Sequence, residues 1–177
     1  RDLHSRGDTQ HTLEWDGSGR SRDGPTWAEA PHVDLIPRVQ KGTRMSLRER
    51  FSLDGEVAVV TGAAQGLGRQ MAAGLAEMGA DVAIADLNHE KGTDTAAELD
   101  GETRVIAVET DVTDEASVRR MAETVTDRLG PIDVLLNNAG IVENAPAEET
   151  TLDAWQRVLA VNLDGVFLCA KHVGRRM

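Results

Sequence analysis

The chain has 177 residues, of which 40% are hydrophobic, and this suffices for one domain with a buried core. Its formal net charge of -11 argues against nucleic acid or an anionic membrane as a partner, because both require clustered basic side chains. No window contains the ~18 apolar residues of a membrane span, and the N-terminus lacks the apolar segment of a secretory signal. Cys169, the single cysteine, cannot form an internal disulfide, which favours a reducing, cytoplasmic location.

A change in composition divides the sequence near Met45. Residues 1–44 contain three prolines, five glycines, and seven acidic and seven basic side chains. This composition predicts a disordered extension that takes no part in the fold. Residues 45–177, with 23 acidic and 12 basic side chains, form the predicted domain.

From residue 56 onward, short β-rich runs alternate with helical periods. This alternation is typical of repeated βαβ units around a parallel sheet. The predicted strands are 57–60, 81–85, 104–108 and 132–136. We therefore predict a doubly wound α/β fold with strand order 3-2-1-4 and ligand binding at the carboxyl ends of the strands.

Helical periods occupy the connections between these strands. The first helix has one apolar stripe, formed by Leu67, Met71, Leu75 and Met78. The second runs from about 88 to 99, and Thr113 is the predicted cap of the third. The last begins near residue 151, and Asn162 and Gly165 interrupt its middle.

The turn between the first strand and the first helix is rich in glycine. Residues 61–68 read Thr-Gly-Ala-Ala-Gln-Gly-Leu-Gly. Glycine permits a positive φ and a close approach of phosphate, while the helix N-terminus offers free N–H groups and a positive dipole. A glycine triplet alone also occurs in simple tight turns, but here a strand precedes it and a helix follows. We predict that a dinucleotide binds at Gly62, Gln65, Gly66, Leu67 and Gly68.

Asp86 stands at the end of the second predicted strand, 18 residues after Gly68. At this position a carboxylate can accept a hydrogen bond from a ribose hydroxyl. It would also repel the additional phosphate of NADP, and neither Gln65 nor Leu87 supplies a cation to bind that phosphate. The predicted cofactor is therefore NAD, preferred over NADP; the alternative is an ordinary loop aspartate. The scattered histidines predict no metal site.

The spacing of Gly62, Gly66 and Gly68 resembles that of the short-chain dehydrogenase/reductase family, whose domain is an NAD(P)-binding Rossmann fold. Three further segments are similar to motifs of that family: Asp111-Val112, Asn137–Gly140 (Asn-Asn-Ala-Gly) and Val161–Gly165. The resemblance extends from about residue 51 to 177.

The resemblance implies a role for each motif. Asp111 and Val112 would flank the adenine ring. Asn138, Ala139 and Gly140 would close the nicotinamide-ribose side of the site. Asn162 is the implied catalytic residue, part of a proton relay with a serine, a tyrosine and a lysine.

The activity implied by the resemblance is NAD-dependent hydride transfer between nicotinamide and a secondary alcohol or ketone, with a sugar, polyol or 3-oxoacyl substrate. The last helix would form a dimer or tetramer interface in the complete protein. The family's serine and Tyr-x-x-x-Lys pair would follow residue 177, and the chain contains no tyrosine. We therefore expect an N-terminal portion with an incomplete sheet, truncated and inactive alone because it lacks a proton donor.

Two other interpretations of the chain stay open. It could be a nucleotide-binding module without catalysis, or a truncated product with no activity of its own. The last residues, His172 to Met177, have no further strand after them, and this favours truncation.

Overall fold

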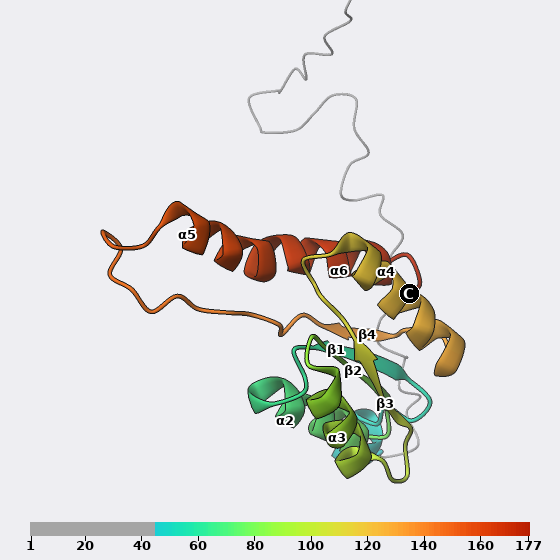
Figure 1. Cartoon of the computed structure of the whole chain (residues 1–177). Coiled ribbons are helices and arrows are strands. Elements are labelled where there is room, and N and C mark those ends of the chain that lie inside the picture. Colours follow the sequence, from blue (N-terminus) through green and yellow to red (C-terminus); the bar gives the residue numbers. More distant parts are fainter. Residues whose placement is uncertain (1–44) are drawn as a thin grey trace, which may run out of the picture. The chain divides into compact units, whose positions relative to one another are not determined.

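A four-stranded parallel sheet forms the centre of the domain (Figure 1), in a computed structural model that describes residues 45–177. The extension predicted for residues 1–44 lies outside the described residues. The sheet has the order β3-β2-β1-β4, which confirms the predicted doubly wound α/β fold. Its strands are β1 (Val57–Thr61), β2 (Asp81–Asp86), β3 (Val105–Glu109) and β4 (Val134–Leu136).

Every residue of β1 is buried, because this strand is central and helices cover both faces of the sheet. β4 is shorter than the predicted 132–136. The Asp133 carboxylate accepts a hydrogen bond from the Val57 N–H (2.9 Å), while the Asp133 N–H donates to the Val57 carbonyl (2.9 Å). A side chain thus replaces a backbone acceptor where the β1–β4 pairing begins.

The helices divide between the two faces of the sheet. They are α1 (Leu47–Arg50), α2 (Gly66–Glu77), α3 (His89–Leu99), α4 (Glu115–Arg128), α5 (Leu152–Leu159), the π-helix η2 (Ala160–Asp164) and α6 (Gly165–Val173). Figure 1 shows α2 and α3 on one face, and α4 and α6 on the other. Each face has its own apolar cluster, so alternate residues of β1 and β2 contribute to opposite clusters.

The apolar stripe predicted for α2 is wrong in part. Leu67 is 74% exposed and Met71 is 42% exposed, while Gly68 and Ala72 are the buried residues of this helix. The helix approaches the turn so closely that a Cβ on Gly68 would lie 2.3 Å from the Gly62 carbonyl oxygen. Small residues therefore face the sheet, and the larger Leu67 and Met71 lie outside the contact.

The predicted cap of the next helix is also wrong. Asp114 caps α4, because its carboxylate accepts hydrogen bonds from the N–H groups of Ala116 (3.0 Å) and Ser117 (3.2 Å). The Thr113 hydroxyl instead donates to the Asp111 carboxylate (2.7 Å), and so does the Thr113 N–H (2.9 Å). The predicted buried face is confirmed, with these members in the core: Val118, Met121, Val125 and Leu129.

A continuous helical stretch runs from Leu152 to Val173 through a π-helical turn. This turn contains Asn162, one of the two residues predicted to interrupt the stretch, whereas Gly165, the other, is the first residue of α6. At Gly165 a Cβ would lie 2.9 Å from Cγ2 of Val112, so glycine lets the stretch pass close to the loop after β3. No helix within residues 45–177 combines the length and apolar character needed to cross a membrane.

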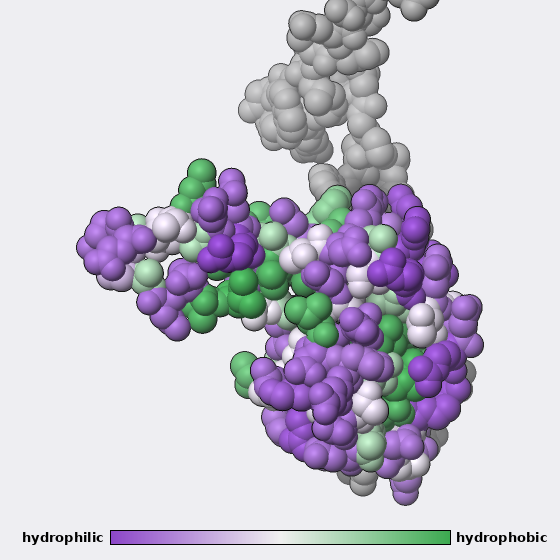
Figure 2. All heavy atoms as spheres, viewed as in Figure 1, coloured by the Kyte–Doolittle hydropathy of each residue, from purple (hydrophilic) through white to green (hydrophobic). Residues whose placement is uncertain are grey.

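Residues 141–159, which we call the arm, extend away from the sheet (Figure 1). They comprise the loop after β4 and helix α5, and Ala154 is the one buried residue among them. Figure 2 shows hydrophobic residues along this part of the surface. The large apolar side chains exposed on the arm are Ile141, Val142, Leu152 and Trp155.

Candidate nucleotide-binding site

A cleft of about 460 Å³ lies at the carboxyl ends of the strands. Its walls come from the segments that follow β1, β2, β3 and β4. The structure brings all eleven predicted cofactor-binding residues to this cleft: Gly62, Gln65, Gly66, Leu67, Gly68, Asp86, Asp111, Val112, Asn138, Ala139 and Gly140. The individual role of each stays a prediction.

The glycine-rich turn forms one wall, and two of its glycines have left-handed backbone angles. Gly62 has φ +65°, and a Cβ there would lie 2.8 Å from Cα of Ala139. Gly66 has φ +60°, but the space beside it is open. Gly62 is therefore fixed by conformation and by packing, whereas Gly66 is fixed by conformation and leaves room beside the backbone.

Thr61 and Asn138 join this turn to the segment after β4. The buried Thr61 hydroxyl donates to the Leu136 carbonyl (3.3 Å) and accepts from the N–H groups of Asn138 and Ala139 (3.0 Å each). The Asn138 Nδ2 donates to the carbonyls of Thr61 (2.9 Å) and Gly62 (3.1 Å). Thr61 is absent from the predicted site; its only sequence signal is a hydroxyl at the end of a buried strand, directly before the glycine turn.

The N-terminus of α2 faces the cleft without a side-chain cap. Its N-cap residue, Gln65, makes no capping hydrogen bond, whereas Asn88, Asp114 and Thr151 cap α3, α4 and α5. The first-turn N–H groups of α2 are therefore left for an acceptor from outside the helix. Together with the helix dipole, they suit the phosphate groups of a dinucleotide.

Asp86 is held in place by two backbone amides. Its Oδ2 accepts from the Ala64 N–H (3.0 Å) and its Oδ1 accepts from the Asn88 N–H (2.9 Å). A carboxylate has about four acceptor positions, so these two bonds orient the group and leave capacity for ribose hydroxyls.

Asp111 and Val112 form the wall contributed by the loop after β3. The Asp111 carboxylate is engaged by Thr113, and its N–H donates to the Ser117 hydroxyl (3.0 Å). Val112 is buried against Gly165. These contacts fix the backbone of the loop, and both bonds from Thr113 go to Oδ1 of Asp111.

Asn162 lies at the rim of the cleft, in the π-helical turn. Its Oδ1 accepts from the Ile141 N–H and its Nδ2 donates to the Ile141 carbonyl, both at 2.9 Å. The carboxamide thereby attaches the start of the arm to η2. Ile141 lines the cleft, so Asn162 is adjacent to the site; its predicted catalytic role stays a prediction.

A lysine that the sequence argument did not consider lies beside the glycine turn. The Nζ of Lys91, on the first turn of α3, donates to the Gln65 Oε1 (3.2 Å). The prediction of NAD preference weighed only Gln65 and Leu87 as possible sources of a cation. Lys91 stands five residues after Asp86, and it could be found from sequence by asking which side chains the first turn of the following helix directs toward the cleft.

The other lysine of the described chain serves a different contact. Lys171 Nζ (2.6 Å) and His172 Nε2 (2.8 Å) both bind the Glu115 Oε1, and they connect α6 to the start of α4. These two partners lower the pKa of Glu115 to about 2. Within residues 45–177 no group of three or more His, Cys, Asp and Glu residues is arranged to hold a metal ion.

The comparison with protein families defines the class of this protein. The short chain dehydrogenase model matches residues 56–177, and the chain belongs to this family. The parallel sheet and its order agree with the Rossmann fold expected for that family.

Two curated members of the family are similar to this chain over most of its length. The chain is 47% identical over 130 residues to D-threitol dehydrogenase of Mycolicibacterium smegmatis, covering 72% of this chain and 49% of that protein. It is 42% identical over 125 residues to sorbitol dehydrogenase of Cereibacter sphaeroides, covering 71% and 48%. The chain thus spans about half the length of these relatives.

A solved structure has a similar fold and is also matched over about half of its length. The 3-ketoacyl-(acyl-carrier-protein) reductase of Brucella melitensis, complexed with NADH, superimposes with a TM-score of 0.67 at 34% identity. The match covers 71% of this chain and 51% of that one.

Proposed function

We propose that residues 45–177 form the NAD-binding part of an oxidoreductase that transfers hydride between nicotinamide and a secondary alcohol or ketone. The observation that carries this proposal is the uncapped N-terminus of α2, which opens onto a cleft lined by the glycine turn and Asp86. Membership in the short chain dehydrogenase family supports it.

Three groups of the chain would hold the dinucleotide. The N–H groups at the start of α2 would bind the pyrophosphate, and Asp86, already oriented by Ala64 and Asn88, would accept from the adenosine ribose. The segment Asn138–Gly140, fixed by Thr61, would border the nicotinamide side. When bound, the nicotinamide supplies the hydride donor or acceptor.

The proposed substrate is a polyol or sugar, and a 3-oxoacyl compound is the alternative. The polyol assignment is supported by the two dehydrogenases described above, and the 3-oxoacyl one by the Brucella reductase. We further propose that the chain is inactive by itself. It contains no tyrosine, and in the described residues the carboxamide of Asn162 is occupied by Ile141.

Assembly and location are proposals of the same kind. We propose that the complete protein is a dimer or tetramer that assembles through its last helical stretch, on which Leu152, Trp155 and Phe167 are exposed. Light scattering coupled to size-exclusion chromatography measures this directly. The free thiol of the buried Cys169 supports a cytoplasmic location.

Titration of the 177-residue chain with NADH, followed by nucleotide fluorescence, tests cofactor binding. We expect saturable binding that is tighter than binding of NADPH. The Asp86→Ala variant loses the acceptor for the ribose, so its Kd for NADH should rise about tenfold. Asp153→Ala removes an exposed aspartate on α5, outside the cleft, and should leave the Kd unchanged.

Circular dichroism on each sample separates loss of binding from loss of fold. A folded chain that does not bind NADH would contradict the proposal. An unfolded chain would contradict the statement that residues 45–177 hold the cofactor without further chain.

A further inference from the structure

Lys91 lies next to the end of the cleft where Asp86 is placed. Its ammonium group contacts the side chain of Gln65, and both Gln65 and Asp86 line the cleft. The residue between these two walls, Ala64, donates its N–H to Asp86. Lys91, Gln65, Ala64 and Asp86 therefore form one connected group at the meeting point of the turns after β1 and β2.

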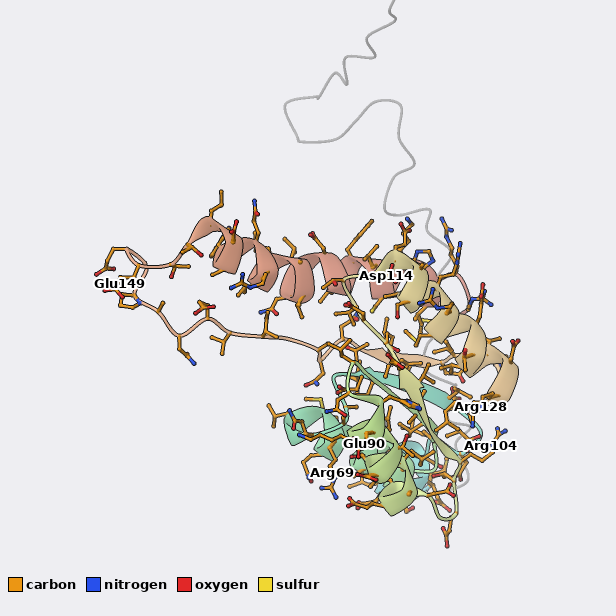
Figure 3. All side chains as sticks on the ribbon, in the orientation of Figure 1. Arg69, Glu90, Arg104, Asp114, Arg128 and Glu149 are labelled. Carbon is orange, nitrogen blue, oxygen red and sulfur yellow. The ribbon has the colours of Figure 1, made fainter. Side chains whose placement is uncertain are left out.

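The positive charge of Lys91 is not neutralised by an ion pair within residues 45–177. Helices α2 and α3 carry two side chains that are cationic at neutral pH, Arg69 and Lys91 (Figure 3 labels Arg69). Arg69 is paired with Glu98 (2.5 Å), whereas within residues 45–177 no carboxylate lies within 4.0 Å of the Lys91 Nζ. Its partner, Gln65, is neutral, so the hydrogen bond places the ammonium group without neutralising it.

The backbone beside Lys91 adds to the local positive potential. Lys91 belongs to the first turn of α3, and its own N–H is bound by the cap residue Asn88 (3.0 Å). The N-terminal end of a helix carries a partial positive charge, which favours an anion in this position. The carboxylates of Asp86 and Glu90 oppose this positive potential, but only Asp86 lines the cleft. The response of the site to an added phosphate is therefore set by the balance between the Asp86 carboxylate and the Lys91 ammonium group.

We propose that Lys91 is a specificity-determining residue that receives the 2′-phosphate of NADP(H). This inference rests on the proposed function. In the wild-type chain Asp86 disfavours that phosphate and Lys91 attracts it, so NADPH binds more weakly than NADH but still binds. Neutralising Asp86 alone then reverses the preference, and no new cation is needed.

The physical basis is the reach and charge of the lysine side chain. An ammonium group on a flexible four-carbon stem can leave the amide oxygen of Gln65 for a phosphate oxygen, which is a charged and therefore stronger acceptor. NADH offers no such group at the ribose, so the contribution of Lys91 to NADH binding is small. The two cofactors consequently report on Lys91 to different extents.

The test is a set of fluorescence titrations of the 177-residue chain with NADH and NADPH. Lys91→Gln should raise the Kd for NADPH about fivefold, the size expected for an exposed charge pair, and change the Kd for NADH less than about twofold. Lys91→Arg keeps the charge and should leave the Kd for NADPH close to that of the wild-type chain. Arg157→Gln removes one positive charge from the exposed face of α5 and is the matched control.

A second pair of variants isolates the interaction. Asp86→Asn should tighten NADPH binding, and Asp86→Asn combined with Lys91→Gln should lose that gain. Raising the salt concentration should shrink the Lys91 effect, because exposed charges are screened.

Each outcome distinguishes the two proposals. If NADH and NADPH both fail to bind, the proposed function is wrong. If NADH binds but Lys91→Gln weakens both cofactors equally, or NADPH does not bind even to Asp86→Asn, the proposed function stands and the role of Lys91 is overturned.

Discussion

The glycine turn and the arm leave neighbouring strands at the same edge of the sheet, but they are held in different ways. The turn after β1 is fixed by the Thr61 hydroxyl, the Asn138 carboxamide and the close contact at Gly68. The arm after β4 is attached at its start by Asn162 and buries one residue, Ala154. Its largest side chain, Trp155, is 54% exposed.

This difference indicates which contacts hold the walls of the cleft in place. On the turn side, side chains and backbone within residues 45–177 complete each other's hydrogen bonds and packing. On the arm side, apolar side chains have no covering element in the described part of the chain. The wall of the cleft formed by the glycine turn is therefore built by contacts within residues 45–177, and substitutions in it should have larger effects than substitutions in the arm.

The largest effect is expected at Gly68. A Cβ there would lie 2.3 Å from the Gly62 carbonyl oxygen and 2.5 Å from the Asn138 Nδ2. Gly68→Ala should lower the free energy of unfolding by about 3 kcal/mol, because the helix must move away from the turn. Gly74→Ala is the control in the same helix; it meets open space and should raise the stability by about 0.5–1 kcal/mol. Urea unfolding measures both, and equal effects would contradict the close contact.

Thr61→Val should have the next largest effect. The methyl group keeps the volume but removes the hydroxyl that serves Leu136, Asn138 and Ala139. The partly buried Ala139 N–H then loses its acceptor, and the Leu136 carbonyl and the Asn138 N–H keep only the hydrogen bond between them (3.0 Å). We expect a loss of about 2 kcal/mol in the free energy of unfolding and weaker NADH binding. Thr150→Val removes a hydroxyl that binds the Pro146 carbonyl in the arm, and its effect should stay within about 0.5 kcal/mol. Similar losses from both variants would remove the distinction between turn and arm.

A pH-dependent effect is expected outside both the turn and the arm, where Glu115 connects α4 to α6. The pKa of Glu115 falls from 4.5 to about 2 in the folded state through its bonds to Lys171 and His172. Its stabilisation is therefore present above pH 4.5 and is lost as the pH falls toward 2. Glu115→Gln should lower the Tm at neutral pH, and the difference from wild type should vanish between these two pH values. Glu143→Gln, in the arm, is the control; a constant difference in Tm for Glu115→Gln would contradict the ion pair.

The smallest effect is expected at Trp155. Because its side chain is largely exposed, Trp155→Ala should change the free energy of unfolding by no more than about 0.5 kcal/mol and leave the Kd for NADH unchanged. Chemical denaturation and NADH titration measure the two quantities. A loss above about 2 kcal/mol would show that the arm is packed in solution. Trp155 would then contribute as much to stability as Thr61 does in the turn.

Local patterns in the sequence were enough to place the strands, apart from the bounds of β4, and the glycine turn; the order of the sheet followed from the fold class that the alternation of strands and helices indicates. Residues of β1 and β2 are continuous apolar runs between helical periods, and this signal needs no knowledge of distant contacts. The positive φ angles at Gly62 and Gly66 follow from the same local logic. Six of the residues that line the cleft could be predicted from their place after a strand: Gly62, Gln65, Gly66, Leu67, Gly68 and Asp86. The resemblance to the family supplied the other five predicted residues, Asp111, Val112 and Asn138–Gly140.

The tertiary structure decided the buried face of α2, the cap of α4 and the position of Lys91. Leu67 and Met71 are exposed because α2 packs closely at Gly68, against the Gly62 carbonyl of the preceding turn and the Asn138 side chain of the segment after β4. The partners of Thr61 lie 77 and 78 positions away, and Lys91 meets Gln65 across 26 positions. Periodicity records which residues are apolar; only the packing of distant segments determines which of them are covered and which polar groups meet.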